Sequence, residues 1–273
     1  MKIAIIGCGY LGSALAQYWA KKGHFITAAT RSAALLKKLE TAFQKRTLID
    51  CNDLERLYAL LEENKLVALC PFAERSEEYE SDYLKLAQTL KQAAIALGEE
   101  RTLFYASSHL VYGNHLGQWV DEEAPLLAAD KETLIQIETE ETLLSLTEQN
   151  YRIAVIRLAN LYGPGEELWR KLEKLNEFVL PGSGENYTNT IHVEDAVRAI
   201  DYLSSRNLYG IYNMADDDHS SQKAQIERIC QKKQLPKIEW DKNRFVLKNN
   251  NLRVSNHKIK STGFTFLHPH FEV

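Results

Sequence analysis

The chain has 273 residues, of which 45% are hydrophobic and 26% charged, a composition typical of a globular protein with a sizeable core. Its 33 Lys and Arg against 37 Asp and Glu leave a net charge of −4, which argues against general binding to nucleic acids or anionic membranes. The sequence has no apolar run near the ~18 residues of a membrane helix, and its four scattered cysteines lack metal spacing. We therefore expect a cytoplasmic protein without a metal site.

Short apolar runs and amphipathic patterns alternate along residues 2–158. The runs predict strands at 2–6, 25–29, 47–49, 66–70, 102–106 and 153–158. Helical periodicity fills the intervals at 11–19, 32–39, 53–61, 77–97 and 131–147. Apolar strands separated by helices predict an α/β fold of the Rossmann type, in which helices cover both faces of a doubly wound parallel sheet.

The pattern becomes less regular after residue 160, with loop signals at Gly163–Gly165 and Pro181–Gly184. A helix at 193–203, a strand at 209–213 and a helix near 222–231 follow. We expect a dinucleotide-binding core in residues 1–160 and a small α+β substrate lobe in residues 161–273. Within that lobe, Val193–Asn213 is expected to return to the core.

A glycine motif follows the first predicted strand and opens the first predicted helix: Gly7-Cys8-Gly9-Tyr10-Leu11-Gly12, which fits GxGxxG. In this setting small residues let the backbone approach a pyrophosphate, and the amide N–H groups at the helix start face the anion. The motif predicts that Gly7, Gly9, Tyr10, Leu11 and Gly12 bind a dinucleotide. A tight turn without a ligand is the alternative.

The second strand leads into Thr30-Arg31-Ser32, at the place where a carboxylate would accept the ribose 2′-hydroxyl of NAD. Arginine and serine instead favour a 2′-phosphate, so Arg31 and Ser32 predict NADP. NAD is the alternative, with Arg31 as a solvated loop residue or stacked on the adenine.

Further segments carry a resemblance to a known family: Phe104–Gly113, Asp121–Pro125, Ile156–Gly165, Ile191–Ala196 and Tyr212-Asn213. With the glycine loop they resemble the extended short-chain dehydrogenases/reductases of the NAD-dependent epimerase/dehydratase type, over nearly the whole chain. That family acts on nucleotide sugars. The family's GxxGxxG loop would place its first glycine at Ile6, so this loop is similar to that of atypical members.

The resemblance implies roles for further residues. Ser108 matches the catalytic Ser/Thr, and Ser107 beside it is grouped with the cofactor residues, while loop capping is the alternative for both. The adenine contacts match Asp50 and Cys51. The loop over the ribose and pyrophosphate matches Pro71, Phe72 and Ala73, and the nicotinamide side matches Asn160 and Leu161.

The family's acid/base pair, Tyr-x-x-x-Lys, is missing from its expected place. No tyrosine lies between Gly113 and Asn150, and the two positions fall near Glu132 and Gln136. In that pair a lysine one helical turn later lowers the pKa of the tyrosine. We expect Tyr112 and Glu132 to act with Ser108 in its place; packing in the loop is the alternative for Tyr112. Residues 121–148 hold nine acids and one base, a pattern typical of a solvated helix face.

The sequence thus predicts an NAD(P)-binding, epimerase/dehydratase-like oxidoreductase with a non-standard active site. Its substrate would be a nucleotide sugar or another small carbonyl or hydroxyl compound. A catalytically inactive NADP(H)-binding sensor or scaffold is the alternative. Because enzymes of the extended family often pair through the helices around 77–97 and 130–147, a homodimer is expected, with no nucleic-acid or membrane partner.

Overall fold

The computed structural model describes residues 1–39, 43–71, 79–128, 130–173, 178–244 and 250–273 and consists of two compact units. Unit 1 comprises residues 1–111, 128–157 and 197–212, and unit 2 comprises residues 112–127, 158–196 and 213–273. Both units are therefore assembled from segments that are distant in the sequence. The predicted functional division at residue 160 stays a prediction.

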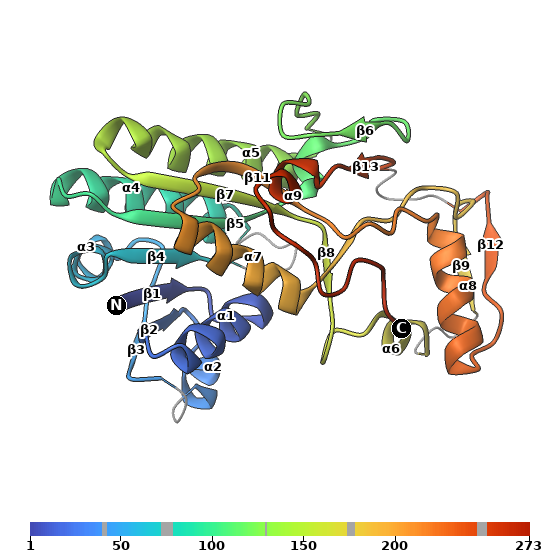
Figure 1. The fold of residues 1–273 in the computed structure, drawn as a ribbon, viewed down its shortest axis with the longest axis horizontal. Coiled ribbons are helices and arrows are strands. Elements are labelled where there is room, and N and C mark those ends of the chain that lie inside the picture. The colour runs from blue at the N-terminus through green and yellow to red at the C-terminus, as the bar shows by residue number, and fades with distance from the viewer. Residues whose placement is uncertain (40–42, 72–78, 129, 174–177, 245–249) are drawn as a thin grey trace. The chain divides into compact units, whose positions relative to one another are not determined.

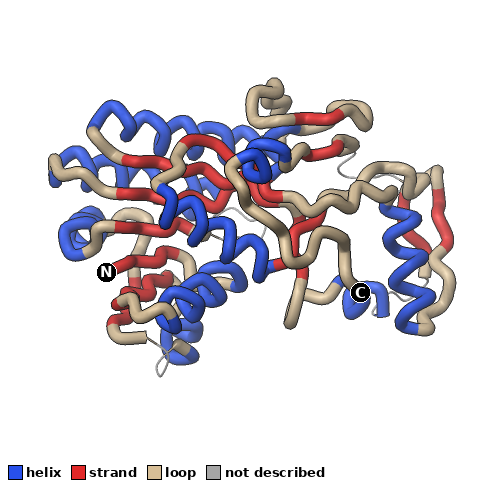
Figure 2. Tube along the Cα trace, viewed as in Figure 1, coloured by secondary structure: helices blue, strands red, loops and turns tan. Residues whose placement is uncertain are grey.

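Unit 1 is built on a seven-stranded sheet in the order β11-β7-β5-β4-β1-β2-β3 (Figures 1 and 2). The strands are β1 (Lys2–Ile6), β2 (Phe25–Thr30), β3 (Lys45–Leu48), β4 (Leu66–Leu69), β5 (Thr102–Ser108), β7 (Arg152–Leu158) and β11 (Gly210–Met214). Parallel ladders join β1 to β2 and β4, β2 to β3, and β4 to β5. This order confirms the predicted Rossmann-type fold, whose ligands bind outside the carboxyl ends of the strands.

Helices cover both faces of this sheet (Figure 1). One layer contains α3 (Leu54–Glu63), α4 (Leu86–Leu97) and α5 (Lys131–Leu144), and the other contains α1 (Tyr10–Lys21), α2 (Ala33–Lys38) and part of α7 (Val193–Arg206). Trp19 joins α1 to α7 because its indole Nε1 donates to Asp201 at 3.0 Å. A large hydrophobic core lies under α3–α5, with Val67, Leu90 and Leu103 among its buried members.

The region predicted as one helix over 77–97 has a different start. A π-helical turn over Ser81–Lys85 precedes α4, and the first two residues of the predicted range lie outside the described residues. The end agrees with the prediction, because Gly98 takes the left-handed conformation that stops a helix. The wider turn adds one residue to the local helical repeat, a feature that often marks functional sites.

Unit 2 contains three two-stranded parallel ladders and three short or medium helices among its described residues. The ladders are β6 (Trp119–Val120) with β13 (Arg253–Val254), β8 (Asn160–Tyr162) with β10 (Thr190–His192), and β9 (Val179–Pro181) with β12 (Glu239–Asp241). The helices are α6 (Leu168–Glu173), α8 (Gln222–Lys233) and α9 (His257–Ser261). Its own buried cluster contains Leu172, Ile226 and Ile229.

Within the described ranges, no helix combines the length and the apolar character needed to cross a membrane.

Candidate functional site

The glycine loop connects β1 to α1 with a backbone that tolerates no side chains at two positions. Gly7 has φ +92°, and a Cβ atom added there would overlap the carbonyl group of Cys70. A Cβ atom at Gly12 would overlap the carbonyl oxygen of Gly7. The two glycines therefore let the loop pack directly against the end of β4 and the first turn of α1, the arrangement in which amide groups face an anion.

A cavity of about 270 Å³ opens beside this loop in unit 1. Six residues predicted to bind the cofactor line it: Gly7, Gly9, Arg31, Ser32, Cys51 and Pro71. Ile6, Cys8, Thr30, Leu35, Ile49, Asp82 and Leu86 complete the wall among the described residues. The cavity thus lies at the carboxyl ends of β1 and β2, where a Rossmann fold receives its ligand.

Tyr10, Leu11, Gly12 and Asp50, which are also predicted to bind the cofactor, are not among the residues that line this cavity. Tyr10, Leu11 and Gly12 form the first turn of α1. Asp50 precedes Cys51 and accepts the backbone N–H of Asn52 at 2.9 Å, a bond that lowers the pKa of its carboxyl group. Phe72 and Ala73 lie outside the described residues.

Arg31 and Ser32 already have partners within the protein. The Arg31 guanidinium forms an ion pair with the carboxylate of Asp82, which comes from the π-helical turn and is 9% exposed. The Ser32 hydroxyl accepts the N–H of Leu35 at 3.2 Å and so caps α2. A carboxylate therefore does line the cavity, although the sequence at the end of β2 contains none.

Ser107 points into the interior of unit 1. Its hydroxyl bonds to Glu140, whose carboxylate also forms an ion pair with Arg157 at 2.8 Å. Glu140 and Arg157 are 1% and 2% exposed. The Ser107 side chain is therefore occupied by a buried polar cluster, and its predicted role at the cofactor stays a prediction.

Ser108 and Glu132, two of the three residues predicted to act in catalysis, both belong to unit 1. Ser108 ends β5, and its Oγ accepts the N–H of Leu110 at 3.2 Å, which leaves its proton available for donation. Glu132 lies half-buried in the first turn of α5, one helical turn before the buried Gln136. The helix predicted for the acid/base residues therefore exists, and it carries a carboxyl and an amide at the two expected positions.

Tyr112, the third residue predicted to act in catalysis, is fully buried in unit 2. Its hydroxyl donates to Asn213 Oδ1 at 2.7 Å, and the backbone N–H of Asn213 donates to Glu122 at 2.8 Å. Burial raises the pKa of Glu122 above its usual value. This network connects Tyr112 and Glu122 to Asn213, about 100 residues further along the chain, and the catalytic role of Tyr112 stays a prediction.

A second cavity, of about 460 Å³, lies within unit 2. Asn160 and Leu161, the residues matched to the nicotinamide side, line it together with Thr190, Gln225 and Phe271. Gln225 is 2% exposed, and its Nε2 finds no hydrogen-bond partner among the described residues. The cavity therefore offers an amide donor to a ligand that carries an oxygen acceptor.

The roles of Arg157 and Asp82 were not predicted from the sequence. The buried ion pair of Arg157 could have been inferred, because a charged residue inside an otherwise apolar strand needs a buried partner. The contact of Asp82 with Arg31 could not, because 51 residues separate the two in the sequence.

Comparison with known proteins gives a consistent picture. Residues 3–215 match the sequence profile described as the NAD dependent epimerase/dehydratase family. No curated protein is significantly similar in sequence. Among solved structures, a functionally unknown conserved protein from Silicibacter pomeroyi DSS has 22% identity and a TM-score of 0.79, with 98% of this chain and 94% of that chain covered.

Two solved epimerases share the same fold. The UDP-glucose 4-epimerase of Thermus thermophilus, in complex with NAD, has 18% identity and a TM-score of 0.81 over 97% of this chain and 94% of that chain. The UDP-glucuronic acid 4-epimerase of Bacillus cereus, also in complex with NAD, has 17% identity and a TM-score of 0.78 over 96% and 92%. At these identities the likeness establishes the fold alone.

Proposed function

The chain belongs to the NAD-dependent epimerase/dehydratase family, and from this premise we propose that it is an NAD(P)-dependent enzyme that acts on a small hydroxyl or carbonyl substrate. The observation that carries the proposal is the cavity at the glycine loop, where Gly7 and Gly12 leave the close approach that a pyrophosphate needs. A bound nicotinamide dinucleotide supplies the hydride acceptor or donor. In this proposal residues 1–160 hold the dinucleotide and residues 161–273 hold the substrate, with Val193–Asn213 returning to the core.

We propose NAD(H) as the preferred form of the cofactor. Asp82 lines the cavity and already binds Arg31, so a 2′-phosphate would meet a carboxylate and would have to compete for the guanidinium. A ribose 2′-hydroxyl, in contrast, can donate to a carboxylate. NADP(H), which Arg31 and Ser32 favour when considered without Asp82, is the alternative.

In the proposed chemistry two residues of unit 1 act on the substrate. The Ser108 hydroxyl donates a hydrogen bond to the substrate oxygen, since its own oxygen already accepts the N–H of Leu110. The Glu132 carboxylate accepts the proton of a substrate hydroxyl, or returns it, from the helix position where the family carries its tyrosine. Tyr112 is a less favoured candidate because its hydroxyl donates to Asn213.

The substrate class that we propose is a nucleotide sugar, because the two solved epimerases with the same fold are a UDP-glucose and a UDP-glucuronic acid 4-epimerase. The test is fluorescence titration with NADH, followed by a turnover screen with UDP-glucose, UDP-galactose and UDP-glucuronic acid in the presence of NAD. We expect binding of NADH and conversion of at least one sugar. Ser108→Ala and Glu132→Gln should each lower turnover by about 100-fold without loss of NADH binding.

A catalytically inactive dinucleotide sensor is the second candidate, and Gln136 is the observation that favours it. This neutral, buried residue stands where the family's lysine would lower the pKa of a neighbouring acid and hold the ribose. Binding of NADH without turnover of any sugar, unchanged in Glu132→Gln, would establish this second function. Failure to bind either dinucleotide would contradict both candidates.

A further inference from the structure

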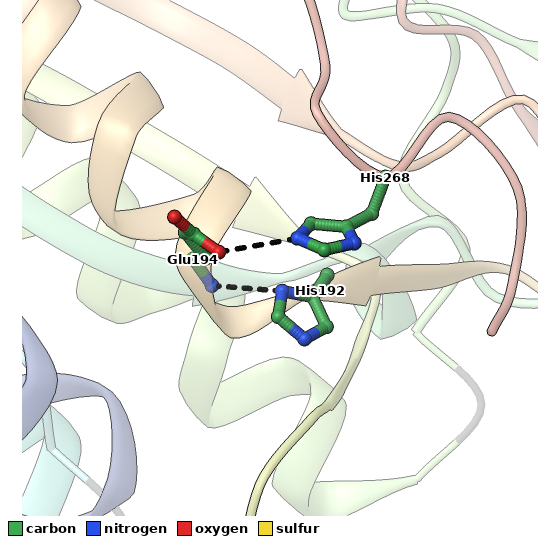
Figure 3. A group of neighbouring side chains, drawn as sticks. All are labelled: His192, Glu194 and His268. Atoms are coloured by element: carbon green, nitrogen blue, oxygen red, sulfur yellow. Dashed lines mark hydrogen bonds and ion pairs between the residues drawn. The ribbon is translucent and has the colours of Figure 1, made fainter. Parts of the chain in front are cut away.

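Two histidines and a glutamate lie together in unit 2, apart from the residues assigned above (Figure 3). His192 ends β10, Glu194 lies in the first turn of α7, and His268 lies in the segment after α9. Their potential ligand atoms all lie within 4.8 Å of one another. We propose that this cluster binds a divalent transition-metal ion of the zinc type.

The separation of two of the ligand atoms already suits such an ion. His268 Nε2 lies 3.2 Å from Glu194 Oε2. Zinc binds histidine nitrogen and carboxylate oxygen at about 2.0–2.2 Å, so two ligand atoms of a tetrahedral site lie roughly 3.3 Å apart. An ion can therefore enter between these two side chains with little change in their positions.

The other ring nitrogen of His268 is held by a second carboxylate. Its Nδ1 lies 2.9 Å from Glu272 Oε1, so Glu272 fixes the orientation of the ring and leaves Nε2 directed at Glu194. A carboxylate on the far nitrogen of a liganding histidine is the common arrangement around protein-bound zinc, where it orients the ring and raises its basicity. Glu272 is a positioning residue in this proposal.

The backbone of the segment that carries His268 is also fixed. The carboxylate of Asp195 accepts the N–H of Leu267 at 2.8 Å and that of His268 at 2.7 Å. These two bonds hold the segment against the start of α7 without help from a metal ion. The cluster is therefore assembled in advance, which lowers the entropy that an ion would otherwise have to offset.

His192 supplies the third ligand after a side-chain rotation. Its ring stacks on that of His268 with centroids 3.8 Å apart and an interplanar angle of 35° (Figure 3). Its Nδ1 accepts the N–H of Glu194 over a long 3.3 Å, a contact that a metal bond replaces. Two histidines and one glutamate are a donor set of known zinc sites, and the exposed Glu194 leaves the fourth position to water.

The proposed ion would lie beside a cavity of unit 2. His192 and Glu272 line a cavity of about 330 Å³ in unit 2, and Phe271 lines both this cavity and the one that contains Asn160. An ion held by His268 would further restrain the segment that carries Phe271. The ion would thus lie at the wall of the unit 2 cavities, and this inference does not depend on the proposed reaction.

The test is isothermal titration of the untagged, chelator-treated full-length protein with zinc chloride, together with the absorption spectrum of the cobalt-loaded protein. We expect one zinc ion per chain and the visible bands of tetrahedral cobalt. Glu194→Gln and His268→Ala should each weaken zinc binding by at least about 10-fold, and Glu272→Gln by about 10- to 100-fold. His257→Ala is the matched control because His257 is an exposed histidine outside the cluster, and it should bind as the wild type does.

Glu194→Gln is nearly isosteric and exposed, so it separates loss of a ligand from loss of folding. Its melting temperature without metal should equal that of the wild type, and added zinc should raise only the wild-type value. The proposal is overturned if zinc binds the wild type substoichiometrically, or if the wild type and Glu194→Gln take up zinc with equal affinity. Neither readout involves turnover, so a failure here leaves the proposed enzyme function untouched.

Discussion

Arg157 and Glu140 form an ion pair in the interior of unit 1, with Nη2 2.8 Å from Oε2 and both side chains nearly inaccessible to solvent. Arg157 comes from β7 and Glu140 from α5, the helix on which the family carries its acid/base residues. The prediction that the acidic stretch 121–148 is a solvated face is therefore wrong for Glu140, and also for Glu122, which is 8% exposed. Glu140 pairs with the buried Arg157, and Glu122 accepts a hydrogen bond from the buried backbone N–H of Asn213.

Arg157→Met should lower the free energy of unfolding by about 3–5 kcal/mol, because it leaves the Glu140 carboxylate buried without its cation. Urea unfolding followed by circular dichroism measures the change. The double variant Glu140→Leu/Arg157→Met removes both charges and should lose less than the single variant. A double variant as unstable as Arg157→Met, or more so, would show that the pair itself stabilises the fold.

Gly7→Ala should abolish NADH binding and reduce stability, because its Cβ atom would displace the Cys70 carbonyl and change the loop. The matched control is Gly23→Ala, since Gly23 also has a positive φ but has no atom within 4 Å of an added Cβ. That control should lose about 1 kcal/mol from backbone strain and keep wild-type binding. Fluorescence titration and thermal melting provide the two readouts, and equal NADH affinity in both variants would refute the assignment of the loop.

Asp82→Asn should raise the affinity for NADPH by about 10-fold relative to NADH, because it removes a carboxylate from the cavity and releases Arg31. Arg31→Ala should weaken NADPH binding more than NADH binding, since it removes the cation that a 2′-phosphate needs. Parallel titrations with both reduced dinucleotides measure the ratio. If the ratio is the same in the wild type and in both variants, the Arg31–Asp82 pair does not select the cofactor.

Asp216 should make stability depend on pH, because burial raises the pKa of its carboxyl group from 3.8 to about 7. The folded state then binds more protons than the unfolded state between about pH 4 and pH 7, so the contribution of this group is full below pH 4 and is lost as pH rises to about 7. Asp216→Asn should remove this dependence and exceed the wild type in free energy of unfolding at pH 8. Thr190 can still bond to the new amide, since its hydroxyl both donates and accepts.

Urea unfolding of the wild type and Asp216→Asn at pH 5 and pH 8 tests the sign. The control is Asp217→Asn, because burial raises the pKa of Asp217 but its bonds to Asn256 and Lys260 outweigh that effect and lower it. That variant should lose stability at neutral pH. A wild-type minus Asp216→Asn difference that does not change between the two pH values would contradict the prediction.

The core of the fold was predictable because its signals are local. The apolar run at 2–6 coincides with β1, and the helix predicted over 32–39 contains α2, which Ser32 caps through its hydroxyl. The glycine loop is a local signal too, because its six residues and the strand and helix beside it are all that the prediction of a dinucleotide site uses. The predicted helix 77–97 and α4 both end just before Gly98, because glycine readily takes the left-handed conformation that ends a helix.

The remaining features depend on pairs that no local pattern reveals. Asp82 pairs with Arg31 and so competes with a 2′-phosphate for its guanidinium. His268 contacts Glu194, although 74 residues separate them in the sequence. The spacing of the cysteines could not reveal the proposed metal site, because its three side chains come together only in the tertiary structure. The π-helical turn was not predicted either, and it carries Asp82, the partner of Arg31.

The position of β11 has a consequence for biosynthesis. This edge strand covers β7, yet residues 159–209 of the chain separate the two, and much of that stretch belongs to unit 2. During synthesis on the ribosome, β7 remains an unpaired edge of the sheet until residue 214 has emerged. Unpaired sheet edges can form hydrogen bonds with other chains. An isolated fragment that stops near residue 160 would lack β11 and would keep the edge at β7 open.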